Sequence, residues 1–444
     1  MDSNPEVLLT GVSRALQRLP RTRRISVAFS GGPDSSVLLE ALARLRDKPG
    51  SDLPVLRALH VNHGLQRQAN AWFAHCESCC RTRGIEFRGL EVFVPRHASQ
   101  SLEEAARNVR YQALGECLEV GEILCTAQHA NDQAETLLLQ LLRGAGPRGL
   151  AAMPELRNFH AGHLARPMLE IGKDLILDCV RHWNLNVVMD PANADQGFAR
   201  VRVRQLLLNN ILEQFPGALK TLNRSACLQA AASDAIETLA SLDSRHCQGS
   251  VEGTLAAGQL CRLPQSRRLE VLRNWLRVQD LTIPNQARLL ELSRQMTTAG
   301  PDRQPLVRWT GGEVRRYRDL IYALGPIVDP QQDFNQHWNP SEELRLPWGR
   351  LWSEETTGQG LKAQYTELKV CLRQGGEHCR PVSHGQSRSL KNLFQEHGVP
   401  PWQRGRVPLI HTADGLAAVA GLWVCESYQA QAGEPGRLIH WQPY

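Results

Sequence analysis

The sequence lacks the features that send a protein into or across a membrane. No apolar run reaches the roughly 18 residues that a membrane-spanning helix needs. The first residues, Met1–Glu6, carry neither a basic leader nor the apolar core of a signal peptide. We therefore expect a cytoplasmic protein with no membrane partner. In that compartment its 12 cysteines are expected to be reduced thiols.

The composition is ordinary for a globular protein and favours no special class. The 444 residues are enough for about two to four domains with cores of their own. Apolar residues make up 42% and charged residues 22% of the chain, both normal values. The net charge of +6 agrees with a nucleic-acid partner, but many enzymes with neutral substrates are as basic. The placement of the charges along the chain therefore has to show whether the partner is a nucleic acid.

A glycine-rich turn at residues 30–35, Ser-Gly-Gly-Pro-Asp-Ser, is the most informative stretch. A β-branched and aromatic run, Arg24–Phe29, precedes it, and Ser36–Leu42 follows with apolar residues at helical spacing. The pattern predicts a tight turn between a buried strand and a helix, with Ser35 or Ser36 as the helix cap. Glycines let the backbone approach a ligand, and the free N–H groups at a helix start bind phosphate.

This turn lacks the lysine of the common mononucleotide loop, Gly-x-x-x-x-Gly-Lys-Ser/Thr. It carries Asp34 instead, and a carboxylate beside a polyphosphate indicates a bridging Mg²⁺ ion. The alternative is a plain glycine turn of an α/β protein. The turn resembles the pyrophosphate-binding loop of the N-type ATP pyrophosphatases. That resemblance implies ATP as cofactor, and it implies these ATP-binding residues: Ser30, Gly31, Gly32, Pro33, Asp34 and Ser35.

Polar side chains recur where later strands are predicted to end. The strand Val55 to Val61 runs into His60, Asn62 and His63, which lie on the ligand side of a doubly wound sheet. We expect them to contact ATP, with a structural role as the alternative. A third strand is predicted from Phe87 to Val94.

A cationic pair follows the third strand. Ser101 and Glu104 form a predicted capping box, and Arg107 and Arg110 share one face of the helix that it opens. The two arginines either bind phosphate or belong to a solvated face.

The fourth strand, Ile123 to Ala127, leads into the cluster Gln128–Thr136. Asp132 and Glu135 are three residues apart, so both point to one side of the predicted helix. Acids are favoured in a first helical turn by the helix dipole alone. Beside an ATP site, we interpret the pair as ligands for a cationic substrate group.

Several basic stretches are predicted to contact RNA phosphates. Each has the alternative of a solvated surface. The stretches Arg308–Trp309 and Arg315–Arg318 interleave cations with aromatic rings, as a surface hairpin or as a stacking surface for bases. The candidates for RNA contact elsewhere are Arg143, Arg148, Arg200, Arg202, Arg204, Arg404 and Arg406.

Cys76, Cys79 and Cys80 form the one cluster that suggests metal or sulfur chemistry. A closed metal site needs four ligands, and no second Cys-x-x-Cys pair supplies them. We interpret the three as reduced thiols of a helix, with sulfur transfer as the alternative.

The organisation that we predict is an α/β domain with a doubly wound, mostly parallel sheet, then a helical domain and a small α+β domain. The boundaries are 1–215 for the α/β domain, 216–325 for the mainly helical domain, 326–350 for a linker and 351–444 for the small carboxyl-terminal domain. Short strands with basic turns are predicted at 368–373, 388–394 and 400–406, and a strand pair around 417–424.

The order of the motifs resembles the tRNA(Ile)-lysidine synthetase family over nearly the whole chain. It runs from the turn at residue 30 through His-Val-Asn-His-Gly-Leu, Asp-Gln-Ala-Glu-Thr and Arg-Gly-Ala-Gly-Pro-Arg-Gly-Leu to Asp190–Asp195, and it returns in Leu-Lys-Asn-Leu-Phe and Pro-Trp-Gln-Arg-Gly-Arg. The family uses ATP to activate C2 of the wobble cytidine of an isoleucine tRNA with a CAU anticodon. The ε-amine of free L-lysine then displaces AMP, which changes decoding from AUG to AUA.

The resemblance implies a catalytic first domain, and it implies that residues 216–325, residues 351–444 and the candidate arginines bind tRNA. It also implies a role for each site residue. Asp34 would hold Mg²⁺, Asp132 and Glu135 would bind lysine, and Arg107 or Arg110 would stabilise charge on the α-phosphate. His129 completes the catalytic set. Gln128 and Asn131 stand where the family usually has a histidine and an aspartate. The sequence leaves open a cysteine-dependent tRNA thiolase or a non-catalytic RNA-binding relative, and it leaves open the oligomeric state, with a homodimer as one option.

Overall fold

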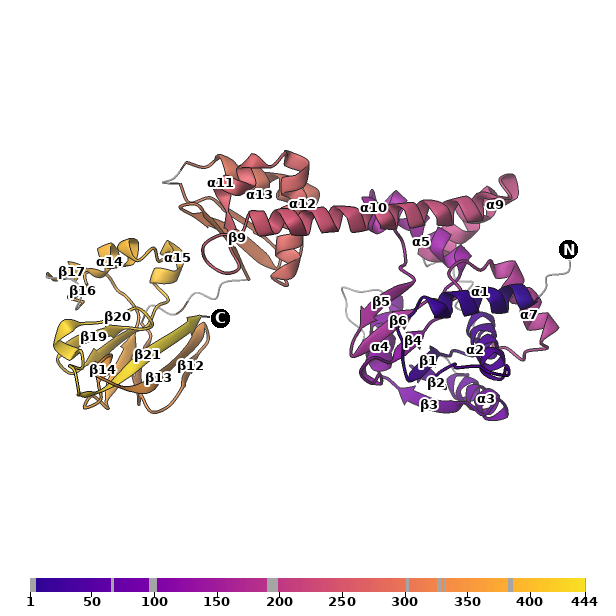
Figure 1. The fold of residues 1–444 in the computed structure, drawn as a ribbon, viewed down its shortest axis with the longest axis horizontal. Coiled ribbons are helices and arrows are strands. Elements are labelled where there is room, and N and C mark those ends of the chain that lie inside the picture. The colour runs from indigo at the N-terminus through magenta and orange to yellow at the C-terminus, as the bar shows by residue number, and fades with distance from the viewer. Residues whose placement is uncertain are drawn as a thin grey trace. The chain divides into compact units, whose positions relative to one another are not determined.

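The computed structural model describes residues 5–64, 68–95, 102–189, 199–300, 303–325, 330, 333–381 and 386–443, without the side chains of 102–104. The chain forms two compact units, Met1–Thr238 and Leu239–Tyr444, called here the N-terminal and C-terminal units (Figure 1). The predicted capping residues Ser101 and Glu104, the motif at 190–195 and part of the predicted linker, residues 326–329 and 331–332, lie outside the described side chains. No helix among the described residues is long and apolar enough to span a lipid bilayer.

A six-stranded sheet forms the centre of the N-terminal unit, in the order β3-β2-β1-β4-β6-β5. All neighbours pair in parallel except β5 with β6, so the predicted mostly parallel sheet is confirmed. The strands are β1 (Arg24–Ala28), β2 (Val55–Asn62), β3 (Glu86–Glu91), β4 (Ile123–Cys125), β5 (Leu156–Phe159) and β6 (Gly162–Ala165).

The strand order reverses beside β1, because β2 and β3 lie on one side of it and β4 on the other. In a doubly wound sheet this switch point opens a crevice at the carboxyl ends of the strands. The turn at residue 30 follows β1, and the cluster at residue 128 follows β4. The topology therefore brings the two polar stretches to the same crevice.

Two apolar clusters hold helices against the sheet. Leu38 and Leu42 of α2 pack with Leu8, Cys76 and Ile176 in the larger cluster. Leu114 belongs to the smaller cluster, with Leu59 and Leu124 of the sheet. The helices are α1 (Pro5–Gln17), α2 (Pro33–Arg46), α3 (Ala69–Thr82), α4 (Leu102–Glu116), α5 (Ala130–Leu142), α6 (Pro147–Leu150) and α7 (Lys173–His182).

The helices α8 (Ala199–Arg202), η2 (Val203–Leu208, a π-helix) and α9 (Asn209–Gln214) continue almost without a break. Val203 and Leu208 pack against Ala134 and Leu138 of α5. The predicted arginine run from 200 to 204 is therefore helical and is held beside the second polar cluster. The long helix α10 (Ala218–His246) runs from the N-terminal unit into the C-terminal one (Figure 1).

The C-terminal unit begins with helices packed on a four-stranded sheet, β7-β10-β9-β8. The strong helical periodicity led the sequence prediction to miss most of this sheet. The hairpin β8–β9 carries the predicted basic and aromatic stretches. The elements are α11 (Ala257–Arg262), α12 (Gln265–Val278), α13 (Gln286–Thr298), β7 (Leu255–Ala256), β8 (Leu306–Trp309), β9 (Gly312–Tyr317) and β10 (Leu320–Leu324).

Two further sheets, β11-β15-β18-β19-β20 and β12-β13-β21-β14, form the rest of the unit. The principal strands are β11 (Asn335–Trp338), β12 (Leu344–Leu346), β13 (Gly349–Thr357), β14 (Leu361–Lys362), β15 (Leu368–Cys371), β18 (Leu409–Thr412), β19 (Gly415–Val419), β20 (Trp423–Val424) and β21 (Pro435–Pro443). A two-stranded sheet pairs β16 (His378–Cys379) with β17 (Arg388–Ser389).

Two expectations for this region are wrong. The segment predicted as a linker contains β11 and β12, whose apolar residues Trp338 and Leu346 are buried in the sheets. The segments predicted as short strands at 388–394 and 400–406 contain the helices α14 (Leu390–Glu396) and α15 (Pro401–Arg404), because Leu390, Leu393 and Phe394 are buried at helical spacing. The strand pair predicted around 417–424 is confirmed by β19 and β20.

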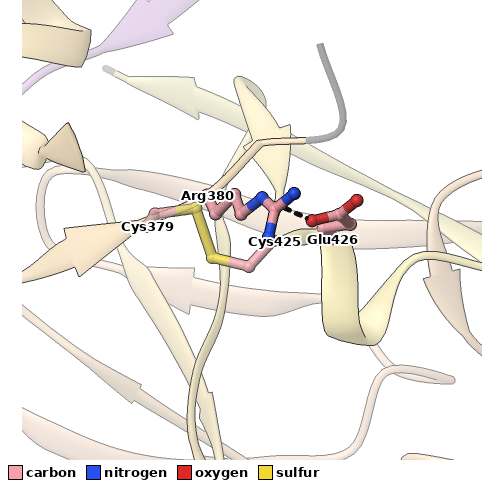
Figure 2. Close-up of a disulfide and its surroundings, with 4 residues drawn as sticks. All are labelled: Cys379, Arg380, Cys425 and Glu426. Carbon is pink, nitrogen blue, oxygen red and sulfur yellow. Dashed lines mark ion pairs between the residues drawn. A yellow bond between two sulfur atoms is a disulfide. The ribbon is translucent and has the colours of Figure 1, made fainter. Parts of the chain in front are cut away.

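A disulfide joins Cys379 to Cys425, with Cα atoms 5.7 Å apart, and Arg380 pairs with Glu426 beside it at 2.7 Å (Figure 2). The expectation that all cysteines are reduced is therefore wrong for this pair. The two residues are 46 positions apart, and only the folded sheets bring them together.

Candidate active site

The crevice at the switch point is a cavity of about 390 Å³, built entirely from the N-terminal unit. Most of the side chains predicted for the ATP and lysine sites line it, together with Tyr111, Gln128 and Val188. The predicted residues in its wall are Ser30, Gly32, Asp34, Ser35, His60, Asn62, His63, Arg107, Arg110, Asp132 and Arg200. The topology thus gathers residues that are up to 170 positions apart.

The turn after β1 is held by its own hydrogen bonds. The Oγ of Ser35 accepts from the backbone N–H of Ser30 at 3.2 Å, and Ser36 Oγ donates to the carbonyl of Gly31 at 3.2 Å. Gly31 has φ = +78°, and a Cβ there would lie 3.0 Å from the sulfur of Cys76, so the position favours glycine twice over. The conformation of the turn is therefore fixed by contacts within the chain.

Neither serine caps the helix, which corrects the sequence prediction. α2 begins at Pro33, one residue after its N-cap Gly32, so Ser35 and Ser36 already lie inside the first turn. Their hydroxyls tie the turn together, which leaves the N–H groups at the start of α2 for a ligand. Pro33 at the first helical position is a common helix start that the sequence reading overlooked.

Asp34 lies at the centre of a small charged group. The ammonium of Lys173, the first residue of α7, pairs with its Oδ1. The Nε2 of His129 lies 3.7 Å from the same oxygen and 3.6 Å from Oδ2 of Asp132. Sequence reasoning missed Lys173, which is 139 positions from Asp34 and belongs to no recognisable motif.

Asn131 explains how Lys173 is placed. Its side-chain oxygen accepts from the backbone N–H of Lys173 at 3.0 Å, and Ala130 donates to the carbonyl of Ile171 at 2.9 Å. The starts of α5 and α7 are thereby tied together. The bond needs only an acceptor oxygen, which an amide provides as well as a carboxylate.

His60 and Asn62, at the carboxyl end of β2, present neutral groups to the cavity. His60 Nδ1 lies 2.8 Å from the carbonyl of Phe29. Burial lowers the pKa of His60 below its usual value, so its ring is neutral at pH 7. Asn62 accepts from the N–H of Gly64 at 2.9 Å and donates to Asn70 at 3.2 Å, which fixes its orientation. These contacts suit the recognition of a neutral base or sugar better than that of a phosphate.

Arg107 and Arg110 meet at the ring of Tyr111, 5.1 and 6.0 Å from its centre. Gln128 donates to the Tyr111 hydroxyl at 3.3 Å and accepts from Thr126. Burial raises the pKa of Tyr111, but the neighbouring arginines and the Gln128 bond outweigh burial and lower it below its ordinary value. This side of the cavity is therefore strongly positive.

Buried Arg166 adds to that positive side. Burial is the main cause that lowers its pKa to about 10, and the charge of Arg157 and Arg107 lowers it further. Its Nη1 donates to the carbonyl of Pro154 at 2.6 Å. A cation kept at this position favours an anion in the cavity nearby.

Asp132 and Glu135 have different surroundings although they lie one turn apart. The carboxylate of Asp132 is 17% exposed and lines the cavity. The side chain of Glu135 is only 1% exposed; its Oε2 lies 2.8 Å from Arg200 and its Oε1 2.5 Å from Arg204. Glu135 is therefore engaged with two arginines, and the binding of a substrate by both acids stays a prediction.

The same contacts bear on the prediction that the arginines at 200–204 contact RNA. Arg200 and Arg204 are committed to Glu135, and Arg200 also lies 3.4 Å from Asp132. They hold α8 and η2 against α5 through the buried carboxylate of Glu135, while the side chains of Arg200 and Arg204 stay 26% and 39% exposed. We call Glu135, Arg200 and Arg204 the ion cluster, and their contact with RNA stays a prediction.

The other predicted RNA contacts are dispersed. Arg143 is exposed after α5, and Arg148 lies 3.3 Å from Glu237. In the C-terminal unit, Arg404 donates to the carbonyl of Val399 at 2.8 Å and to the hydroxyl of Tyr317 at 3.1 Å. Arg202 and Arg406 are half-buried or exposed at their own places, and neither lines the cavity.

The three helix cysteines are part of the core. Cys76 and Cys80 are fully buried, and burial raises the pKa of each thiol to about 12. Cys79 Sγ lies 3.5 Å from His75 Nε2. Among the described residues no group of three or more His, Cys, Asp or Glu side chains forms a metal site. Protonated core thiols are poor nucleophiles, which favours a structural role.

The chain is similar to known proteins along its whole length. Three family models match it: a PP-loop domain over residues 8–211, a TilS substrate binding domain over 255–322 and a TilS substrate C-terminal domain over 368–441. It is 37% identical over 440 residues to the tRNA(Ile)-lysidine synthase of Alkalilimnicola ehrlichii, covering 98% of this chain and 97% of that one. It is 35% identical over 444 residues to that of Coxiella burnetii, covering 99% and 97%. It is 37% identical over 428 residues to that of Methylococcus capsulatus, covering 94% and 96%.

Proposed function

The chain belongs to the tRNA(Ile)-lysidine synthase family, and we propose that its N-terminal unit joins lysine to C2 of the wobble cytidine of an isoleucine tRNA with a CAU anticodon. The observation that carries the proposal is one shared cavity. The ATP-type turn with Asp34 and the acid Asp132 line the same 390 Å³ space. Because the proposed substrate is a tRNA, we place the reaction in the cytoplasm.

In the first step, the C2 oxygen of the cytidine attacks the α-phosphorus of ATP, the bond to the β-phosphate breaks, and pyrophosphate leaves. The N–H groups at the start of α2 are available for the leaving phosphates. Arg107 and Arg110 line the same cavity, and we assign to them the stabilisation of charge on the α-phosphate. The product is an adenylated base.

Asp34 fits a magnesium ligand. Its carboxylate is one-third exposed in the cavity, and Lys173 occupies Oδ1, which leaves Oδ2 for a cation. A hard oxygen ligand next to a polyphosphate site has the chemistry that Mg²⁺ prefers. When bound, the ion would neutralise charge on the leaving phosphates.

In the second step, the ε-amine of lysine attacks C2, the C2–O bond breaks, AMP leaves, and the nitrogen loses a proton. We assign the binding of a lysine ammonium group to Asp132, whose carboxylate faces the cavity, and not to Glu135. His129 Nε2 lies 3.6 Å from Asp132, so its ring is placed to accept that proton. The ion cluster of Glu135, Arg200 and Arg204 adjoins Asp132, because Arg200 lies 3.4 Å from the Asp132 carboxylate.

The direct test is mass spectrometry of the wobble nucleoside after incubation of the full chain with ATP, L-lysine and the unmodified tRNA. We expect lysidine, formed only when all three are present. A thiolated cytidine would contradict the proposal and favour sulfur transfer by the cysteines of α3. A replacement of Cys76, Cys79 and Cys80 by serine that keeps lysidine formation would exclude that alternative.

A further inference from the structure

We propose that Lys173 is a pyrophosphate-binding residue and replaces, from another part of the fold, the lysine that the turn itself lacks. The common mononucleotide loop carries a lysine that reaches the β- and γ-phosphates. Here the turn carries Asp34, and the Lys173 ammonium is brought to that carboxylate. The inference rests on the proposed use of ATP at this turn.

The position of Lys173 supports a phosphate contact. Its side chain is 29% exposed, so the ammonium is within reach of water and of a ligand, and is not a buried structural charge. Its partner Asp34 lies in the first turn of α2, next to the N–H groups that are free to bind an anion. A four-carbon side chain can move its charge by several ångströms while its backbone stays fixed.

The surroundings hold the backbone of Lys173 firmly. Three helix starts meet here: α2 after Gly32, α5 after His129 and α7 after Gly172. Hydrogen bonds from Lys173 to Asn131 and from Ala130 to Ile171 join the last two. Each helix start contributes partial positive charge, so the ammonium adds to a field that already favours an anion.

The ion pair with Asp34 also suggests how the contact forms. In the structure, Lys173 neutralises Asp34. When a cation and phosphates approach, the carboxylate turns to the cation and the ammonium to the phosphate oxygens, so neither charge is left unpaired. Lys173 would then hold the leaving pyrophosphate, while Arg107 and Arg110 hold the α-phosphate side.

The experiment measures the binding of inorganic pyrophosphate and of AMP to the full chain by titration calorimetry, in EDTA and in Mg²⁺. Lys173→Met is expected to weaken pyrophosphate binding about 10- to 100-fold, as for the loss of one charged hydrogen bond. AMP binding should stay within about twofold, because AMP does not carry the lost phosphates. Lys173→Arg should restore most of the affinity.

Lys48→Met is the matched control, since Lys48 is an exposed lysine beyond the far end of α2. It should leave both affinities unchanged. Thermal unfolding of each variant checks that the fold is kept. Equal pyrophosphate affinities for the parent chain and Lys173→Met would overturn the inference.

The Asp34→Asn background separates contact from positioning. If Lys173 touches phosphate, Lys173→Met weakens pyrophosphate binding in EDTA even when Asp34 has been replaced. If the loss disappears in that background, Lys173 acts only by orienting Asp34, and the inference fails. Lysidine formation by the parent chain is measured separately. If the parent chain forms lysidine but Lys173→Met binds pyrophosphate as tightly as the parent chain, only this inference is overturned. If the parent chain does not bind ATP, the proposed function is overturned.

Discussion

The two units use similar basic and polar residues in opposite ways. In the N-terminal unit, side chains from the ends of β1, β2 and β4 converge on one cavity and leave charges such as Asp34 and Asp132 facing it. In the C-terminal unit, the basic and aromatic residues pack on each other. Arg315 lies 5.3 Å from the centre of the Trp402 ring, and Trp402 contacts Tyr322 at 5.3 Å between ring centres.

The difference shows what kind of pattern predicts a site. The carboxyl ends of parallel strands must meet at one edge of the sheet, so motifs placed there are brought together by topology. A run of arginines and aromatic rings has no such constraint. It serves equally well for stacking on bases and for packing one sheet on another.

The largest expected effect is at Asp34. Asp34→Asn removes the charge that we assign to the cation and to Lys173, and should lower the rate of tRNA-dependent pyrophosphate release by about 1000-fold or more. Rapid-quench measurement with labelled ATP checks this. If the variant released pyrophosphate normally, the cavity would not be the site of ATP cleavage, and the contrast between the units would lose its basis.

The next effect separates the two acids of α5. Asp132→Asn should raise the KM for lysine about 100-fold, because a charged hydrogen bond to the substrate is lost, with little change in stability. Glu135→Gln should instead destabilise the N-terminal unit by about 3 kcal/mol, since it leaves Arg200 and Arg204 without their buried partner. Kinetics at varied lysine and thermal unfolding of both variants make the comparison.

A raised KM for lysine in Glu135→Gln with unchanged stability would contradict that assignment. It would mean that lysine displaces Arg200 and Arg204 from Glu135 and that the ion cluster opens during the reaction.

A smaller effect tests the arginines of the two units. Arg404→Ala should lower the stability of the C-terminal unit by about 1 to 2 kcal/mol, through its bonds to Val399 and Tyr317. It should leave the salt dependence of tRNA binding unchanged. Arg143→Ala, at an exposed position, should lower the slope of log affinity against log salt by about 0.7 to 0.9. The reverse result would mean that the packed cluster opens to bind RNA.

The smallest effect is expected at Gln128. Gln128→His should leave lysine-dependent modification equal or faster, because histidine can still hydrogen-bond to Thr126 or Tyr111 and can also carry a proton. Single-turnover rates of the parent chain and of Gln128→His check this prediction. A large loss would show that the amide itself is needed for the bond to Tyr111.

Sequence reasoning found the parallel sheet and most residues of the cavity because those residues lie in short motifs at strand ends. It missed Lys173, because a lysine at the start of an unremarkable helix carries no local signal and is placed by the fold alone. It placed Asp132 and Glu135 on one side of the helix, but it gave no sign that Glu135 is buried and Asp132 partly exposed. Arg200 and Arg204, which decide that exposure, come from 65 and 69 positions away.

The same limit explains the errors in the C-terminal unit. The pairing of Cys379 with Cys425 and the strands β11 and β12 depend on partners distant in the sequence. Prolines and glutamines near residue 330 indicated a linker, but the apolar residues that follow them are buried in the sheets.

The central claim is that Asp34 and Asp132 act at successive steps in one cavity. The most direct test is to incubate tRNA and labelled ATP with Asp132→Asn, without and with lysine, and to isolate the tRNA. We expect adenylated tRNA to accumulate in both cases when lysine is kept near the KM of the parent chain, whereas Asp34→Asn forms none. If Asp132→Asn formed no adenylated tRNA, the two acids would act in the same step, and the assignment of lysine binding to Asp132 would be contradicted.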